Sequence, residues 1–169
     1  LNTNVASMCE CSETEPLKER TVLIAIDESH HSERALKWYL DNMRHENDCI
    51  RFVHVIEPGF HTQAFGIAVI SPPVIDLNHA MEKRIEGGRN KCAEYVEKLK
   101  QIGVRSEGFI YVDNKPGPAI LKAACELKAN VILMGSHGGG FIRRTFLRSV
   151  SHDVLLNAQI PVVVVPPQK

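Results

Sequence analysis

Five short, mainly apolar segments recur along the chain, and each ends where polar or turn-forming residues begin. Runs of this length are typical of strands that are buried on both faces, as in a parallel sheet. The predicted strands are Thr21–Asp27, Cys49–Ile56, Gly108–Asp113, Val131–Gly135 and Pro161–Pro166.

Between these segments, apolar residues repeat at the three- and four-residue spacing of helices. Ser29 or Ser32 can cap the first helix, and Pro116 suits the first turn of the third. The adjacent Gly87 and Gly88 predict a bend or a frayed first half in the second helix. The predicted helices are one after Ser29 (inward Ala35, Leu36, Tyr39, Leu40 and Met43), one over Leu77–Ile102 (Cys92, Tyr95, Val96 and Leu99), one from Pro116 (Ile120, Leu121, Ala124 and Cys125) and one over Ser149–Asn157.

Strict alternation of strands and helices predicts a three-layer α/β/α domain, with one parallel sheet covered on both faces. The chain has 169 residues, which suits a single domain with a sizeable core. Residues 1–20 are polar and aperiodic, so we expect a flexible tail followed by one domain over 21–169. The stretch at about 57–76 predicts a long loop that is either functional or disordered.

Charge and hydropathy narrow the classes of partner. Lys plus Arg and Asp plus Glu each number 20, so no net field favours nucleic acid or a membrane surface. No apolar run approaches the roughly 20 residues that span a bilayer. The N-terminal stretch also lacks the apolar core of a signal peptide. We therefore expect a cytoplasmic protein without a nucleic-acid or membrane partner.

The five cysteines show no repeating spacing. Cys49, Cys92 and Cys125 stand among apolar residues, where we expect reduced and buried thiols. Cys9 and Cys11 lie in the polar tail with no further His or Cys pair nearby, so we expect no metal site. This usage favours a reducing, intracellular compartment.

The most informative stretch begins where the fourth predicted strand stops at Gly135. Further glycines lead toward the helix start at Ser149, without the spacing of a P-loop or of G-x-G-x-x-G. A glycine loop before a helix N-terminus can hold an anion, although glycines alone favour an ordinary turn. Ligands of parallel sheets bind beyond the carboxyl ends of the strands. Asp27, either a ligand or a strand-end cap, would face Gly135 across one crevice, and together they indicate a nucleotide.

Other side chains near this crevice have two interpretations each. Arg143 and Arg144 either steer phosphates or form a solvated loop pair. His137 lies in a turn without a carboxylate near in sequence, which favours packing or hydrogen bonding over a role as base. His30 and His31 are expected to be surface residues before the first helix rather than metal or phosphate ligands.

Taken together, the motifs resemble the universal stress protein family. The resemblance spans Thr21 to Pro166 and implies a five-stranded sheet in the order 3-2-1-4-5, of the adenine nucleotide alpha hydrolase-like type. It rests on Ala25-Ile26-Asp27, Val53-His54-Val55-Ile56, Gly117–Leu121, Met134–Gly138, Arg143-Arg144, Ser149–Ser151 and Asn157–Val165.

The resemblance also implies a cofactor and a set of contacts. One subclass of the family binds ATP, with or without Mg²⁺. By position, Asp27 would meet the ribose or adenine, Ala25 and Val55 would line the adenine pocket, Met134 and Gly135 would border the adenosine, and Gly138, Ser149 and Val150 would hold phosphates beside His137 and Arg148.

A homodimer is a further implication, because the last strand of the family commonly pairs antiparallel with its copy. Residues Val162, Val163, Val164 and Val165 suit that role, since an unpaired apolar edge strand is a liability unless it is covered. Regulatory protein partners are expected, but the sequence does not name them.

One position departs from the family signature, in which Gly, two residues, Gly, nine residues and Gly precede Ser or Thr. Here Arg148 replaces the last glycine and Ser149 is retained. The arginine either crowds the phosphates or adds a charge-assisted hydrogen bond, and we expect phosphate binding to persist.

The first hypothesis for the function is an ATP-binding regulatory homodimer of the stress response. The alternatives are a slow ATPase, which lacks a Walker lysine, and a nucleotide-free dimer that acts through protein contacts.

Overall fold

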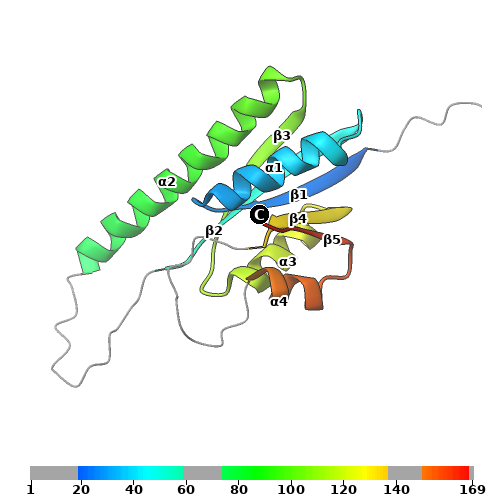
Figure 1. Ribbon diagram of the computed structural model, residues 1–169. Coiled ribbons are helices and arrows are strands. Elements are labelled where there is room, and N and C mark those ends of the chain that lie inside the picture. Colours follow the sequence, from blue (N-terminus) through cyan, green and yellow to red (C-terminus); the bar gives the residue numbers. More distant parts are fainter. Residues whose placement is uncertain (1–18, 59–73, 137–149, 168–169) are drawn as a thin grey trace, which may run out of the picture.

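The computed structural model describes residues 19–58, 74–136 and 150–167, in which strands and helices alternate (Figure 1). Residues 1–18 of the predicted tail, most of the loop at 57–76 and the glycine-rich segment 137–149 lie outside the described residues. The elements are β1 (Arg20–Ile26), α1 (His30–Asn42), β2 (Asp48–Ile56), α2 (Val74–Gln101), β3 (Arg105–Val112), α3 (Pro116–Glu126), β4 (Val131–Gly135), α4 (Val150–Asn157) and β5 (Val162–Val165).

The strands form one parallel sheet in the order β3-β2-β1-β4-β5, which confirms the predicted fold class. Leu23 at the centre of β1 lies opposite Arg51 on β2 and Ile132 on β4. Strand order reverses direction between β1 and β4, because β2 and β3 extend the sheet to one side of β1 and β4 and β5 to the other.

Alternate residues of each strand enter two separate cores. Val22 and Ile24 of β1 point toward α1 and α2, whereas Leu23 points toward α3 and α4, and all three are fully buried. Figure 1 shows the same division, with α1 and α2 on one side of the sheet and α3 and α4 on the other. Burial on both faces explains the continuous apolar character of the central strands.

The helix α2 is continuous through Gly87 and Gly88. Gly88 is buried, and a Cβ on it would lie 2.8 Å from Cδ2 of His54 and 3.1 Å from Cδ1 of Ile56. A glycine here allows the helix to approach the sheet closely. The helix also begins at Val74, three residues before the predicted Leu77, and thereby shortens the loop.

A partly buried ion pair closes the amino end of the sheet. Arg20 donates from Nε and Nη2 to the two carboxylate oxygens of Asp48, each at 2.7 Å, and Tyr39 donates its hydroxyl to the same carboxylate. The carboxylate also accepts from the backbone N–H of His45 at 2.9 Å. Arg20 therefore belongs to β1 rather than to the tail, which corrects the predicted boundary at residue 20.

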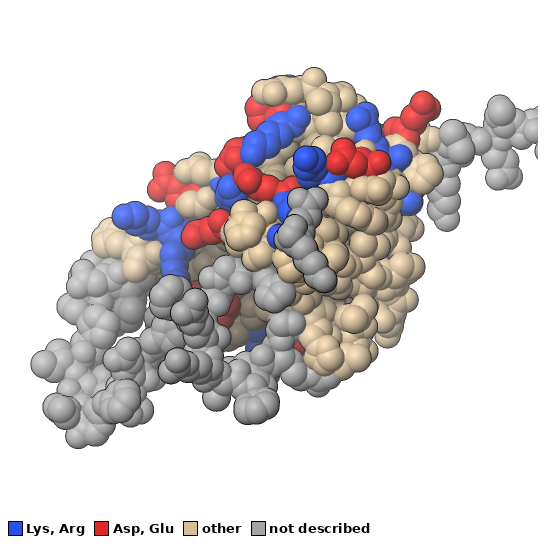
Figure 2. Space-filling model, in the orientation of Figure 1, with Lys and Arg blue, Asp and Glu red and all other residues tan. Residues whose placement is uncertain are grey.

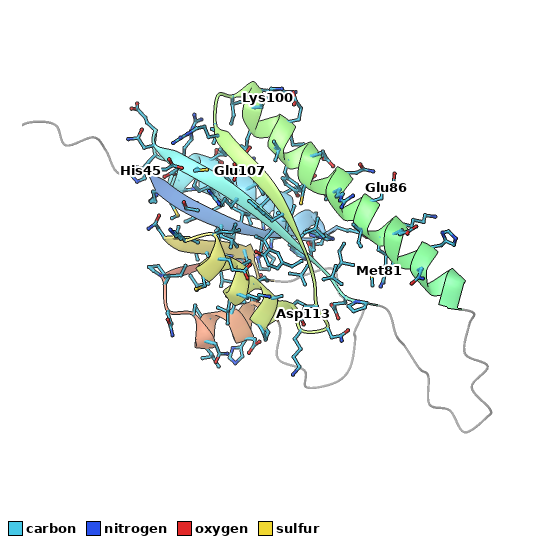
Figure 3. All side chains as sticks on the ribbon, turned by 180° about the vertical axis from the view of Figure 1, so that it is seen from behind. His45, Met81, Glu86, Lys100, Glu107 and Asp113 are labelled. Carbon is cyan, nitrogen blue, oxygen red and sulfur yellow. The ribbon has the colours of Figure 1, made fainter. Side chains whose placement is uncertain are left out.

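Two other predictions fail at the surface. β3 begins at Arg105, not at Gly108, because an edge strand keeps polar residues on its exposed side. Figure 3 shows one of these polar residues, Glu107, on the strand near Lys100 at the end of α2. Cys125 is exposed rather than inward-facing, whereas Cys49 and Cys92 are buried as predicted. In the described part of the chain, no helix is long and apolar enough to cross a membrane.

Candidate functional site

A cleft of about 170 Å³ lies at the carboxyl ends of β1, β2 and β4, beside the first turns of α3 and α4. It therefore lies where the strand order reverses, the position at which doubly wound sheets bind ligands. Its lining residues are Ala25, Ile26, Asp27, His31, Ser32, Val53, Val55, Glu57, Pro116, Ile120, Met134, Gly135, Val150 and Ser151.

One side of the cleft is apolar. Ala25 and Val55 are half-buried, lie one residue before the ends of β1 and β2, and belong to the apolar cluster on the α3 side of the sheet. Ile120 packs against the same cluster from α3. The helix is brought here by the turn after β3, in which Asp113, labelled in Figure 3, accepts the backbone N–H of Lys115 at 2.9 Å. The result is an apolar surface suited to a flat, weakly polar group.

Asp27 lies at the opposite rim and is held by the start of α1. Its Oδ1 accepts the hydroxyl of Ser29 at 2.6 Å, the hydroxyl of Ser32 at 2.7 Å and the backbone N–H of Ser29 at 3.0 Å. Ser29 is also the N-cap of α1, because its hydroxyl accepts the N–H of His31. Asp27 is thus a strand-end cap that also lines the cleft, so the two interpretations offered for it are compatible.

Gly135 ends β4 directly under the first turn of α1. A Cβ at this position would lie 2.9 Å from both Cβ and the backbone oxygen of His31. The glycine is therefore required by helix packing, independently of any ligand. His31 is half-buried and lines the cleft, and His30 is exposed, so the prediction of two surface histidines holds for His30 alone.

Hydrogen bonds to the strand ends define the remaining rim. The buried His54 ring donates from Nδ1 to the carbonyl of Ile26 at 2.9 Å, which anchors the residue before Asp27. Arg84 of α2 donates to the carbonyl of Glu57 at 2.7 Å. Because strand ends bound in this way have little freedom, the cleft is formed by fixed backbone.

The structure brings together the described residues that the sequence proposed for one site: Ala25, Asp27, Val55, Met134, Gly135 and Val150. His137, Gly138, Arg143, Arg144, Arg148 and Ser149 lie outside the described residues.

Sequence reasoning missed Ser32, Val53, Glu57, Pro116, Ile120 and Ser151 as lining residues. Ser32 could have been found, because it lies one helical turn after a strand-ending carboxylate. Pro116 and Ile120 depend on how α3 packs, which periodicity does not specify. No group of three or more His, Cys, Asp and Glu side chains among the described residues is arranged to hold a metal ion.

A doubly wound parallel sheet with a cleft at its switch point is the arrangement in which many α/β proteins bind small ligands. The family model described as "Universal stress protein family" matches residues 19–166. The chain belongs to this family.

Individual relatives agree with this assignment. A universal stress protein of Thermus aquaticus is 30% identical over 148 residues, which cover 86% of this chain and 98% of the relative. The structure of protein MJ0577, from Methanocaldococcus jannaschii, is similar with a TM-score of 0.71 and 25% identity over 89% of this chain and 97% of the other. A family member from Arabidopsis thaliana, solved with AMP bound, gives a TM-score of 0.59 and 19% identity over 88% of this chain and 92% of the other.

Proposed function

We propose that this protein binds ATP in the cleft between Asp27 and Gly135 and acts as a regulatory protein of the stress response. The observation that supports this most directly is the cleft itself, with an apolar side and with a fixed carboxylate and a closely packed glycine beside the first turn of α1. The AMP complex of a protein with the same fold is consistent with an adenine nucleotide as the ligand class.

The chemistry of the lining suits each part of a nucleoside. Ala25, Val55 and Ile120 offer apolar contact to a base. Asp27 can accept a hydrogen bond from a sugar hydroxyl or an amino group, as acidic residues after strands do in other nucleotide sites. The exposed Glu57 at the same end repels phosphates, so the phosphates would extend away from β2 toward the start of α4.

A regulatory role requires that ATP bind two conformations, or two assemblies, with different affinities. We propose that occupancy of the cleft changes the conformation or the choice of protein partner, and that Mg²⁺ accompanies the phosphates. Rapid hydrolysis is not part of the proposal. A slow ATPase would appear as phosphate release that depends on the same cleft.

The first experiment is denaturation of the purified protein and mass spectrometry of any released nucleotide, followed by calorimetric titration with Mg·ATP. We expect a Kd tighter than about 100 μM, or roughly −5.5 kcal/mol. Asp27→Ala should abolish binding, whereas Asp41→Ala, at an exposed carboxylate of α1 outside the cleft, should leave it unchanged. No nucleotide and no heat at millimolar ATP would refute the proposal and favour the nucleotide-free alternative.

We also propose that the protein is a homodimer paired through β5. This strand is an edge of the sheet. The backbone N–H groups of Ile132 and Ser136 donate to the carbonyls of Pro161 and Val165, so the backbone groups of the odd-numbered residues of β5 point toward β4. The backbone groups of Val162 and Val164 then face the open edge. Figure 2 shows few charged side chains on the lower right of the molecule, where Figure 1 places β5 and α4.

The dimer can be tested without disturbing the sheet. Val164→Pro removes an outward N–H but no bond to β4, so it should convert a dimer into a folded monomer in analytical ultracentrifugation. Val164→Thr retains the N–H and should remain dimeric. A wild-type monomer at 100 μM would refute this mode of assembly.

A further inference from the structure

The directions of the hydrogen bonds around Asp27 can be assigned from donors and acceptors alone. The backbone N–H of Asp27 donates to the hydroxyl of Ser32 at 2.8 Å, and the N–H of His31 donates to the hydroxyl of Ser29 at 3.3 Å. A hydroxyl has one proton to give. Both serine hydroxyls therefore donate their protons to Oδ1 of Asp27, at 2.7 and 2.6 Å.

With the N–H of Ser29, one carboxylate oxygen thus accepts three hydrogen bonds from the first turn of α1. Three donors fix the rotamer of Asp27 relative to the helix and use Oδ1 as an acceptor. The carboxylate presented to the cleft is consequently oriented in advance and acts as an acceptor. A ligand group that meets it must be a donor.

We infer that Ser29 and Ser32 are positioning residues, which orient the carboxylate of Asp27 to select ligands by a donor group, namely a ribose hydroxyl or the exocyclic amine of adenine. This inference rests on the proposed function, because it concerns how the same cleft distinguishes ATP from related nucleotides. Ser32 borders the cleft but is only 3% exposed, so its effect on a ligand is transmitted through Asp27.

The two serines allow variants that separate positioning from folding. Ser32→Ala removes one donor to Asp27. Ser29→Gly removes another while retaining a residue that caps helices almost as well as serine, and Ser29→Thr restores the hydroxyl. Thermal melts of each variant report any loss of α1 stability, independently of the ligand measurement.

The test compares ATP with three analogues, 2′-deoxy-ATP, 3′-deoxy-ATP and the triphosphate of purine riboside, which lacks the amine. In the wild type, we expect one analogue to bind about tenfold more weakly than ATP, and that analogue identifies the donor that meets Asp27. In Ser32→Ala and Ser29→Gly, the preference for ATP over this analogue should fall toward unity, because ATP loses affinity and the analogue does not. Ser29→Thr should recover the preference.

Each other outcome overturns the inference. If Ser32→Ala weakens all four ligands by the same factor, the serine has a structural role only. If wild type binds ATP and Ser32→Ala binds it equally well with the same preference, positioning is refuted while the proposed function stands. If wild type binds none of the four ligands, the proposed function fails and the inference fails with it.

Discussion

Gly88 of α2 lies against the ring of His54 on β2 so closely that a Cβ would be 2.8 Å from Cδ2. The neighbouring Gly87 is exposed and has nothing within 4 Å of the same added atom. Two adjacent glycines of one helix therefore have opposite environments. Since His54 also donates to the carbonyl of Ile26, the packing of α2 is linked to the residue that precedes Asp27.

This contrast predicts opposite effects of one substitution. Gly87→Ala should raise the free energy of unfolding by up to about 1 kcal/mol, because alanine favours helix and meets no atom. Gly88→Ala should lower it by about 1–3 kcal/mol, because the ring of His54 must move. Urea denaturation of both variants provides the measurement. A stable Gly88→Ala protein would show that the helix can shift without cost.

Two buried tyrosines provide a second matched pair. Tyr39 donates its hydroxyl to the carboxylate of Asp48, whereas the hydroxyl of the fully buried Tyr95 has no hydrogen-bond partner among the described residues. Tyr39→Phe should destabilise the protein by about 1.5–3 kcal/mol, the range for a hydrogen bond to a charged group. Tyr95→Phe should be neutral or stabilise it by about 1 kcal/mol, because it removes an unsatisfied polar group. Equal losses in denaturation would contradict this account.

The pH dependence of stability should follow the buried carboxylate of Asp48. Burial opposes its ionisation, but hydrogen bonds from Arg20, Tyr39 and the N–H of His45 outweigh burial and hold the pKa below its usual range. A lowered native pKa means that its contribution is complete above the unfolded pKa of about 3.9 and is lost as the pH falls through the native pKa.

Asp48→Asn should therefore lower stability by about 3 kcal/mol at pH 7, since it leaves Arg20 without its carboxylate. Its loss of stability in acid should be shallower than that of the wild type, and the two curves should converge toward pH 2. Chemical denaturation at intervals from pH 2 to 7 measures both. If the free energy of unfolding fell equally steeply with pH in both proteins, groups other than Asp48 would cause the acid sensitivity.

Thiol reactivity should separate the cysteines by their exposure. Burial raises the pKa of the Cys92 thiol to about 11, whereas Cys125 is exposed on α3. At pH 8, iodoacetamide should alkylate Cys125 in the native protein and reach Cys49 and Cys92 only after denaturation, because the thiolate is the reactive form. Peptide mapping by mass spectrometry distinguishes the sites. Native labelling of Cys92 at the rate of Cys125 would indicate local opening of α2.

The central strands were predictable because burial on both faces leaves a strong apolar signal. Val131–Gly135 matches β4 residue for residue, and Asp27 directly follows the last residue of β1. The edge strand β3 was predicted to begin three residues late, since Arg105 and Glu107 are exposed and give no apolar signal. Strand order itself followed from the family resemblance, not from periodicity.

Close packing between distant segments was not predictable. Gly88 is a helix breaker by local propensity, and only the approach of β2 shows why the helix tolerates it. The inward position given to Cys125 followed helical spacing, but α3 turns that side to solvent. Ser32 differs from these cases, because its position shortly after Asp27 was a usable signal for their hydrogen bond.

Arg20 lies at the amino end of β1 and Asp27 directly follows its carboxyl end. This separation has a practical consequence for handling the protein. The described chain enters at Glu19, beside the ion pair with Asp48, and β1 then crosses the whole sheet before it reaches the cleft (Figure 1). A tether or fluorescent label joined ahead of Glu19 would be attached at the amino end of β1, which is the end opposite the cleft. Immobilisation through that end is therefore the attachment of choice for surface-based binding assays.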